Sequence, residues 1–390
     1  MNGPADHKPP DISLFHLFLR FLRFGALAWG GPVAQIAMIR HELVDRDRWV
    51  PSDRFNRVLA VCQVLPGPEA HELCVYFGMI ARGRVGAFLA GLGFMLPGLL
   101  LMLGLSWFYV TYGISSYIFS ALLLGFQPAV IALIVRAIHR IGGHALTDHW
   151  LWLIAVVSAV MHWLGVNFLI TLPVAGVAYS LIKGKFPWKP GALPAMSVLP
   201  VCFLQSGGIL AIPDAGNLFI SGLRAGLLTF GGAYTVIPFL QHDAVIAGAW
   251  MTNEQFLDGI ALSGIIPAPL VIVATFVGYL GGGLTGALCI TAGVFLPAFA
   301  FTMVGHSVIE KVVENKSLHA FLDGVTAGVI GLITVVAIEL FPTAVTNVPG
   351  FMIFAASLIL IFQWKSKFAI PAIVLAAGVC GLLIRTVGWL

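Results

Sequence analysis

The sequence predicts an all-α polytopic membrane protein built from two inverted-topology repeats, each with about five transmembrane helices and one re-entrant helical hairpin. The composition, an internal repeat and the distribution of basic residues among the loops lead to this fold class. Of 390 residues, 59% are hydrophobic and 10% are charged, and the mean hydropathy is +0.97, whereas soluble domains carry about 25% charged residues. Apolar stretches of roughly 20 residues, the length that spans a bilayer, recur along the chain. This composition leaves no soluble catalytic domain and excludes nucleic-acid binding.

An internal repeat relates the two halves of the chain. Residues 22–44 align without a gap with residues 223–245, at a shift of 201 positions, and glycine, proline and tryptophan residues continue to coincide beyond them. Agreement of this extent indicates a duplication. We therefore predict an N-terminal repeat at 1–190, a linker at 191–215 and a C-terminal repeat at 216–390.

The loop charges indicate that the two repeats have opposite orientations. The loop at 40–57 holds five arginines, whereas its copy at 241–256 holds no Lys or Arg. Cytoplasmic loops of membrane proteins are enriched in basic residues. The first loop is therefore expected in the cytoplasm and the second on the outside, which requires an odd number of crossings in each repeat.

The second apolar segment of each repeat is predicted to be a re-entrant hairpin. The first repeat has six apolar segments, at 14–39, 55–81, 85–110, 117–140, 150–164 and 167–183. Basic residues flank 55–81 at both ends, and Pro66-Gly67-Pro68 near its middle leaves two arms of roughly 12 residues. At about 1.5 Å per residue, such an arm spans little more than half of the hydrocarbon layer. We expect segments 55–81 and 256–280 to turn back, which leaves five crossings; the alternative is an ordinary span with a proline kink.

Two arginines and two proline-rich tips are the candidates for an anion site. Arg23 and Arg224 occupy equivalent positions inside the first helix of each repeat, where a charge costs about 2.5 to 3.5 kcal/mol unless it faces a cavity or an anion. Snorkelling to the interface is the alternative. At each tip, proline starts a new helix whose free amides can bind an anion, and paired broken helices build the substrate site in transporters with inverted repeats. The predicted substrate-binding residues are Arg23, Gly30, Gly31, Gln63, Pro66, Gly67, Pro68, Arg224, Gly231, Gly232, Pro267, Ala268, Pro269 and Thr275.

An ionisable cluster follows the first tip. Glu69, His71 and Glu72 stand where the second repeat has Leu270, Val271 and Ile272. Ionisable residues in an apolar segment are usually functional, so the three are candidates for taking up a proton coupled to transport. For Glu69 the alternative is a helix cap that pairs with a nearby arginine.

The chain is predicted not to be an enzyme. It contains no Gly-x-Ser-x-Gly, HExxH or Walker sequence. Its five cysteines form no CxxC pair, so no metal site is expected. No cofactor is expected either. An intramembrane enzyme that uses the cluster after the first tip is the alternative from another functional class.

Three motifs resemble the signatures of the chromate transporter (CHR) family. They are Trp29-Gly30-Gly31-Pro32, the run Gln63-Val64-Leu65-Pro66-Gly67-Pro68-Glu69-Ala70, and Phe230-Gly231-Gly232-Ala233-Tyr234 with the later Pro267-Ala268-Pro269. The resemblance covers nearly the whole chain, in the order of the two-domain members. One departure is Ala268, which stands where the family usually has glycine.

The resemblance implies a secondary active transporter that exports chromate across the cell inner membrane and confers chromate resistance. Sulfate has nearly the same charge and shape, so a transporter of sulfate or another inorganic anion is an alternative, as is a passive anion channel. The expected partners are the oxyanion and the lipid bilayer, with a homodimer as a possible assembly. The implied location is the inner membrane, with multiple crossings.

Overall fold

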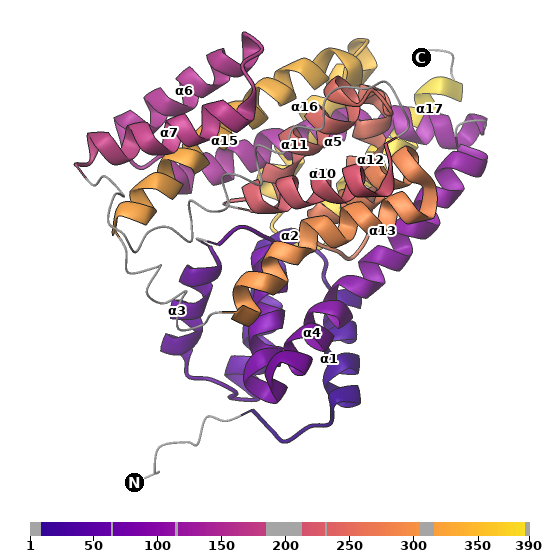
Figure 1. Ribbon diagram of the computed structural model, residues 1–390. Helices are drawn as coiled ribbons and strands as arrows, with labels where there is room; N and C mark the ends of the chain where they lie inside the picture. The colour runs from indigo at the N-terminus through magenta and orange to yellow at the C-terminus, as the bar shows by residue number, and fades with distance from the viewer. Residues whose placement is uncertain are drawn as a thin grey trace.

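The computed structural model describes residues 9–63, 65–113, 116–184, 213–230, 232–304 and 316–386. These parts of the chain contain helices and no strands (Figure 1). The first half comprises α1 (Leu14–Ala26), α2 (Gly31–Arg40), η1 (His41–Arg46), α3 (Ser52–Cys62), α4 (Glu69–Phe108), η2 (Tyr109–Gly113), α5 (Tyr117–Ala145), α6 (His149–Trp163) and α7 (Phe168–Ile182). The second comprises α10 (Ala215–Leu228), η3 (Ala233–Val236), α11 (Ile237–Gln241), η4 (His242–Ala247), α12 (Asn253–Ile265), η5 (Leu270–Ile272), α13 (Val273–Val304), α15 (Lys316–Ala344), α16 (Val348–Gln363) and α17 (Ala369–Thr386).

Five of the described helical stretches are long and apolar enough to cross a membrane: Glu69–Gly113, Tyr117–Ala145, Leu270–Met303, Leu318–Ala344 and Ala369–Thr386. Three further apolar helices, α6, α7 and α16, are shorter. In Figure 1, α6, α7, α15 and α16 gather at one end of the molecule, and α1, α3 and the start of α4 lie at the other, near the N-terminus. The prediction of an all-α polytopic membrane protein is confirmed.

The predicted linker at 191–215 lies outside the described residues except for its last three positions. α10 begins immediately afterwards, where the Asp214 carboxylate accepts a hydrogen bond from the Asn217 amide at 2.7 Å. This is an ordinary helix N-cap.

The segment at 14–39, predicted as one crossing, is divided into two helices. Gly30 and Gly31 both have positive φ (88° and 76°), a conformation that glycine adopts without steric cost. Pro32 follows in the first turn of α2, where its missing N–H costs nothing. A hydropathy profile does not show this break because apolar residues continue on both sides of it.

After the break, α2 and η1 lead the chain back to α1. Arg20 pairs with Asp47, and Arg23 Nη2 lies 3.8 Å from Glu42 Oε1. Both pairs join α1 to the segment that follows α2. The chain therefore enters and leaves this first hairpin at the same end.

A second helical hairpin follows directly. It consists of α3, the first tip (residues 65–68) and the first arm of α4 (residues 69–82). Phe55 of α3 stacks on Phe77 of this arm, with ring centroids 6.3 Å apart. The two helices therefore lie side by side and antiparallel, and the ends of the hairpin, near Ser52 and Arg82, lie together.

α4 then reverses direction at Gly83, where φ is 62°. Gly78 and Gly86 face each other so closely that a β-carbon on either would clash with the carbonyl oxygen of the other. The second arm of α4 (residues 84–108) consequently packs against the first arm in the opposite direction. Arg82 also bonds the Ile12 carbonyl at 2.5 Å, which places the start of α1 beside this reversal.

The second half repeats the same backbone path. α12 leads into the second tip (residues 266–269), and α13 leads out of it and reverses at Gly283, where φ is 59°. Gly278 and Gly286 pack as closely as the equivalent pair in α4. The glycines that coincide in the sequence repeat thus make the same turn twice.

The two halves interlock at their tips. Gly67 of the first tip packs against Ala298 of α13, and Ala268 of the second tip packs against Gly98 of α4. Gly98 lies in the second arm of α4, and Ala298 is the equivalent position in α13, after the reversal at Gly283. Each tip therefore rests on the second arm of the long helix of the other half, which we call the long arm. The Gly67 amide also donates a hydrogen bond to the Thr229 carbonyl, at the end of α10, at 3.0 Å.

The hairpin that contains α3 and the equivalent hairpin that contains α12 lie at opposite ends of the second arm of α4. The hairpin that contains α3 begins beside Gly83, where this arm starts. At the far end of α4, Tyr109 donates a hydrogen bond to Asp258 of α12 at 2.9 Å, and its ring packs edge-on against Phe276 at 5.0 Å. The hairpin of the second half therefore lies along the end of α4 that is farthest from Gly83.

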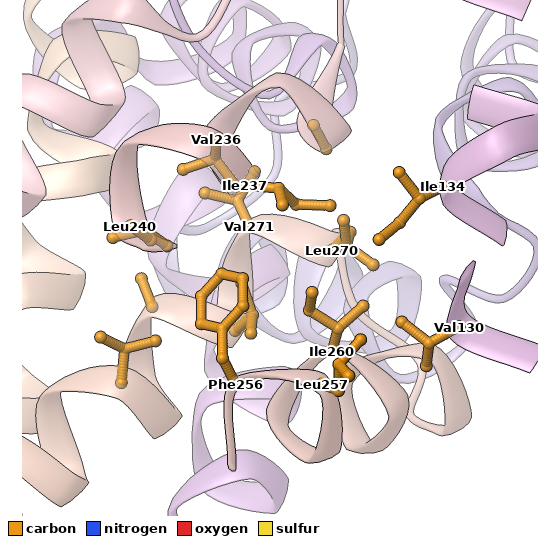
Figure 2. Packing of buried hydrophobic residues seen from close by; sticks show 14 of the residues in the cluster. Val130, Ile134, Val236, Ile237, Leu240, Phe256, Leu257, Ile260, Leu270 and Val271 are labelled. Atoms are coloured by element: carbon orange, nitrogen blue, oxygen red, sulfur yellow. The ribbon is translucent and has the colours of Figure 1, made fainter. Parts of the chain in front are cut away.

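The hydrophobic core fills the space between these hairpins and α5. Figure 2 shows Val130 and Ile134 of α5 facing Ile260 of α12 and Leu270 of η5. Phe256, Ile260 and Val271 are fully buried. Packing of this kind fixes the second tip against α5.

The ends of α6 and α7 are tied together outside the apolar helices. Lys183 Nζ lies 2.7 Å from Asp148 Oδ2, and Tyr179 donates a hydrogen bond to the same oxygen at 2.7 Å. The hydrogen bond from Lys183 lowers the pKa of the Asp148 carboxyl. These contacts place the start of α6 and the end of α7 at the same end of the bundle.

Candidate functional site

A small cavity lies where the two halves meet. Its volume is about 30 Å³, enough for water. The Trp29-Gly30-Gly31-Pro32 segment of the first half forms one wall, and Tyr234, Ser263 and Ala268 of the second half contribute to the other. The break between α1 and α2 and the second tip therefore face a common space.

Two helix starts lie near this junction without a side-chain cap. α2 begins after Gly30, and α4 begins after Pro68, and in neither case does a side chain bond the first-turn amides. Uncapped N-termini attract anions through their free N–H groups and the helix dipole. At α2 this geometry suits a negatively charged solute, whereas the first turn of α4 already holds the carboxyl groups of Glu69 and Glu72.

The predicted arginines each have an acidic neighbour. Arg224 is buried, and its Nη2 lies 3.7 Å from Asp243 Oδ2. Arg23 is exposed and lies beside Glu42. Glu42 and Asp243 are themselves equivalent residues, at the same shift of 201 as the arginines. The duplication has therefore preserved an arginine–carboxylate pair, and neither arginine lines the cavity.

The ionisable cluster after the first tip is buried between the halves. His71 and Glu72 have no exposed surface, and their polar atoms have no hydrogen-bond partner in the described part of the chain, although the Gly91 backbone and the Cys62 thiol lie near. The His71 ring meets Phe295 and Phe299 of α13 edge-on, at 5.0 and 4.7 Å. The burial of polar groups without hydrogen-bond partners costs free energy. Such costly burial is typical of a functional position.

Other predicted residues are placed away from the cavity. Gln63 is exposed at the end of α3. The Thr275 hydroxyl lies 2.7 Å from that of Thr291, inside the α13 hairpin. Pro66, Pro68, Pro267 and Pro269 are buried at the two tips and Gly232 is half-buried, and Gly231 lies outside the described residues. The structure thus brings together Gly30, Gly31 and Ala268, with Gly67 close to Glu72.

Sequence reasoning missed a buried polar network. Asp258 is 4% exposed, and besides the bond from Tyr109 it accepts one from the Gln127 amide of α5 at 2.9 Å. Its equivalent in the first half is Arg57, so comparison of the repeats did not draw attention to it. The signal available was a single acid within the apolar segment at 256–280.

A family model described as chromate transporter matches residues 15–181 and, separately, 216–382. The chain belongs to the chromate transporter family. The two matches show that the family domain occurs twice, which confirms the duplication. Because this is a transporter family, the prediction that the chain is not an enzyme is confirmed.

Relatives in the chromate transporter family cover almost the whole chain. A chromate transport protein of Pseudomonas aeruginosa is 53% identical over 98% of this chain and 95% of its own length. One of Cupriavidus metallidurans is 32% identical over 97% of this chain and 94% of its own. A probable chromate transport protein of Synechococcus elongatus is 30% identical over 97% of each. No solved structure matches the chain.

Proposed function

We propose that this protein is a secondary active transporter that exports chromate from the cytoplasm across the cell inner membrane, and that it thereby confers chromate resistance. Full-length relatives that are named chromate transport proteins support the substrate. The observation that carries the mechanism is the cavity between the Gly30–Gly31 break and the second tip, because it joins the two repeats at broken helices. Broken helices at a repeat interface are where secondary transporters bind their substrates.

We propose that the repeats, at 1–190 and 216–390 with a linker at 191–215, have opposite orientations in the membrane. The family matches support these boundaries. The hairpin of the second repeat lies along the end of α4 that is farthest from the first hairpin, as an inverted pair would require. The arginines of loop 40–57 then mark the cytoplasmic end of the first repeat.

Each repeat would begin with two re-entrant hairpins. Both hairpins turn back near the middle of the membrane. In the first repeat these are α1 with α2, and α3 with the first arm of α4. The second arm of α4 is the first helix that continues past the tips. This proposal replaces the single crossing expected at 14–39 with a second re-entrant element. Four of the six apolar segments of the first repeat then cross the membrane. Because opposite orientation needs an odd number of crossings, the inverted arrangement requires one further crossing outside these six segments.

The substrate would bind at the two tips and at the glycines of the α1–α2 break. Backbone amides of Gly30 and Gly31, and of the helices that follow the tips, would meet the oxyanion oxygens. Arg23 and Arg224 stay predicted ligands, and the carboxylates beside them would reduce the net charge that they offer. Glu69, His71 and Glu72 stay predicted proton carriers, a role supported by the complete burial of His71 and Glu72.

Uptake of radiolabelled chromate by everted membrane vesicles or proteoliposomes tests this function. An imposed pH gradient or potential should drive saturable accumulation, with sulfate as competitor. Glu72→Gln should flatten the dependence on the pH gradient if this carboxyl carries the proton. Flux that does not saturate and only follows the chromate gradient would instead identify a passive channel.

A further inference from the structure

A tetrahedral dianion needs positive charge that the protein has not already neutralised. Arg23 and Arg224 lie 3.8 and 3.7 Å from a carboxylate. Arg20, Arg40, Arg46 and Arg82 also form ion pairs with acidic residues. The substrate charge must therefore be met mainly by other groups near the junction of the repeats.

Arg136 and Arg140 of α5 differ from these arginines. They are four residues apart, so both side chains project from one face of the helix. Arg136 is half-buried and Arg140 is exposed. Among the ion pairs of the described residues, none includes either arginine.

The turn of α5 before these arginines packs against a wall of the cavity. Leu133 lies against Gly264, and Ile134 faces Leu270 (Figure 2); both Gly264 and Leu270 line the cavity. Arg136 follows Leu133 by three residues and therefore lies on the same side of α5.

Electrostatic interactions also connect the two arginines to the cavity and to a tip. Both act on Tyr234, which lines the cavity, and Arg140 acts on the Glu69 carboxyl, directly after the first tip. Arg136 and Arg140 thus adjoin both the cavity and the first tip, with Glu69 as an acidic neighbour of Arg140.

We propose that Arg136 and Arg140 form the charge-binding part of the substrate site and hold a tetrahedral dianion beside the cavity at Trp29 and Tyr234. This inference rests on the proposed function. Guanidinium groups bind two oxygens of an oxyanion at once. Arg136, being half-buried, binds the anion more strongly, and the exposed Arg140 attracts it from solvent. Arginines that only anchor α5 at the membrane surface would have no such effect.

Equilibrium binding of radiolabelled chromate and sulfate to the purified full-length protein tests the pair. Arg136→Gln should weaken binding of both anions about tenfold or more, in line with the loss of a charged hydrogen bond. Arg136→Lys should restore part of the affinity, because lysine keeps the charge but loses the planar fork. Arg140→Gln should have a smaller effect that shrinks at high salt.

Arg84→Gln is the matched control. Arg84 is exposed, forms no ion pair with a described residue, and lies beside the Gly83 reversal, so its loss should leave affinity unchanged. Size-exclusion chromatography checks that each variant is folded. A double variant R136Q/R140Q with wild-type affinity would overturn the proposal, as would an equal loss in R84Q.

Transport by the same preparations separates this inference from the proposed function. Wild-type protein that binds both anions but does not transport chromate would contradict the proposed function, while the binding constants of the variants would still decide the role of the arginines. Wild-type protein that binds neither anion would overturn both proposals.

Discussion

At each tip, one glycine and one alanine meet. Gly67 faces Ala298, and Ala268 faces Gly98. Gly67 has a positive φ of 148°, which disfavours any residue with a β-carbon, and Ala268 is not among the described residues with positive φ. The alanine that departs from the usual family motif is therefore accommodated by its own backbone and by the absence of a side chain on Gly98.

Gly98→Ala should destabilise the protein because its new methyl group overlaps that of Ala268. Overpacking of this kind costs about 1 to 3 kcal/mol. Adding Ala268→Gly to this variant should recover most of the loss, since it recreates the pairing found at the first tip. Thermal unfolding in detergent measures both variants, with Gly104→Ala as the control, because a β-carbon there meets no described atom. Equal stability of G98A and the double variant would contradict this account.

The Asp258 carboxylate joins α12 to two elements of the first repeat. Asp258→Ala should leave the Tyr109 hydroxyl and the Gln127 amide without their acceptor, at a cost of about 1 to 3 kcal/mol for each group. The melting temperature in detergent should fall clearly. Glu254→Ala, an exposed position on the same helix, should change it little. A normal melting temperature for D258A would show that water replaces the carboxylate.

The break between α1 and α2 makes a topological prediction at the scale of elements. Asp11 pairs with Arg82, beside the Gly83 reversal, so a cysteine at position 11 should label from the same side of the membrane as one at position 53. A single crossing at 14–39 would place these two positions on opposite sides. Impermeant thiol labelling of single cysteines in a cysteine-free background distinguishes the two arrangements.

A control for this experiment comes from the second repeat. Cysteines at Ser52 and Thr252, which occupy similar places in the two repeats, should label from opposite sides. Labelling of both from one side would contradict the opposite orientation of the repeats, whatever the result at position 11.

The elements that could be predicted from the sequence are those marked by rare residues in both repeats. The proline-rich tips coincide at a shift of 201, and Gly83 coincides with Gly283 at a shift of 200, so equivalent turns in the two repeats follow from the sequence. The reversal at Gly30 could not be predicted from hydropathy, since it depends on two backbone angles. Asp258 was missed because its partners, Tyr109 and Gln127, are distant in sequence and come together only when the repeats interlock.

At the scale of the whole molecule, neither repeat completes its own packing. Each tip rests on the long arm of the other repeat, and His71 of the first repeat packs between Phe295 and Phe299 of the second. A half expressed alone would expose these apolar surfaces, which normally pack inside the protein.

Separately expressed halves, divided within residues 191–212, should therefore fail to accumulate alone. Co-expression should restore both, and an affinity tag on one should retain the other. Membrane abundance measured by immunoblot, followed by co-purification, checks this. Stable accumulation of either half alone would show that the contacts at the tips contribute little to folding.

The exchange of glycine and alanine at the tips also has an evolutionary consequence. A symmetric pair of first repeats would place Gly67 against Gly98 and leave a gap, while a pair of second repeats would force Ala268 against Ala298. The fused chain avoids both because the two copies differ at both positions. A single change, Gly98→Ala in the first copy or Ala268→Gly in the second, would restore a glycine–alanine contact in a symmetric pair. With neither change present, each copy finds a matching surface only on the other, and this favours inheritance of the two copies as one chain.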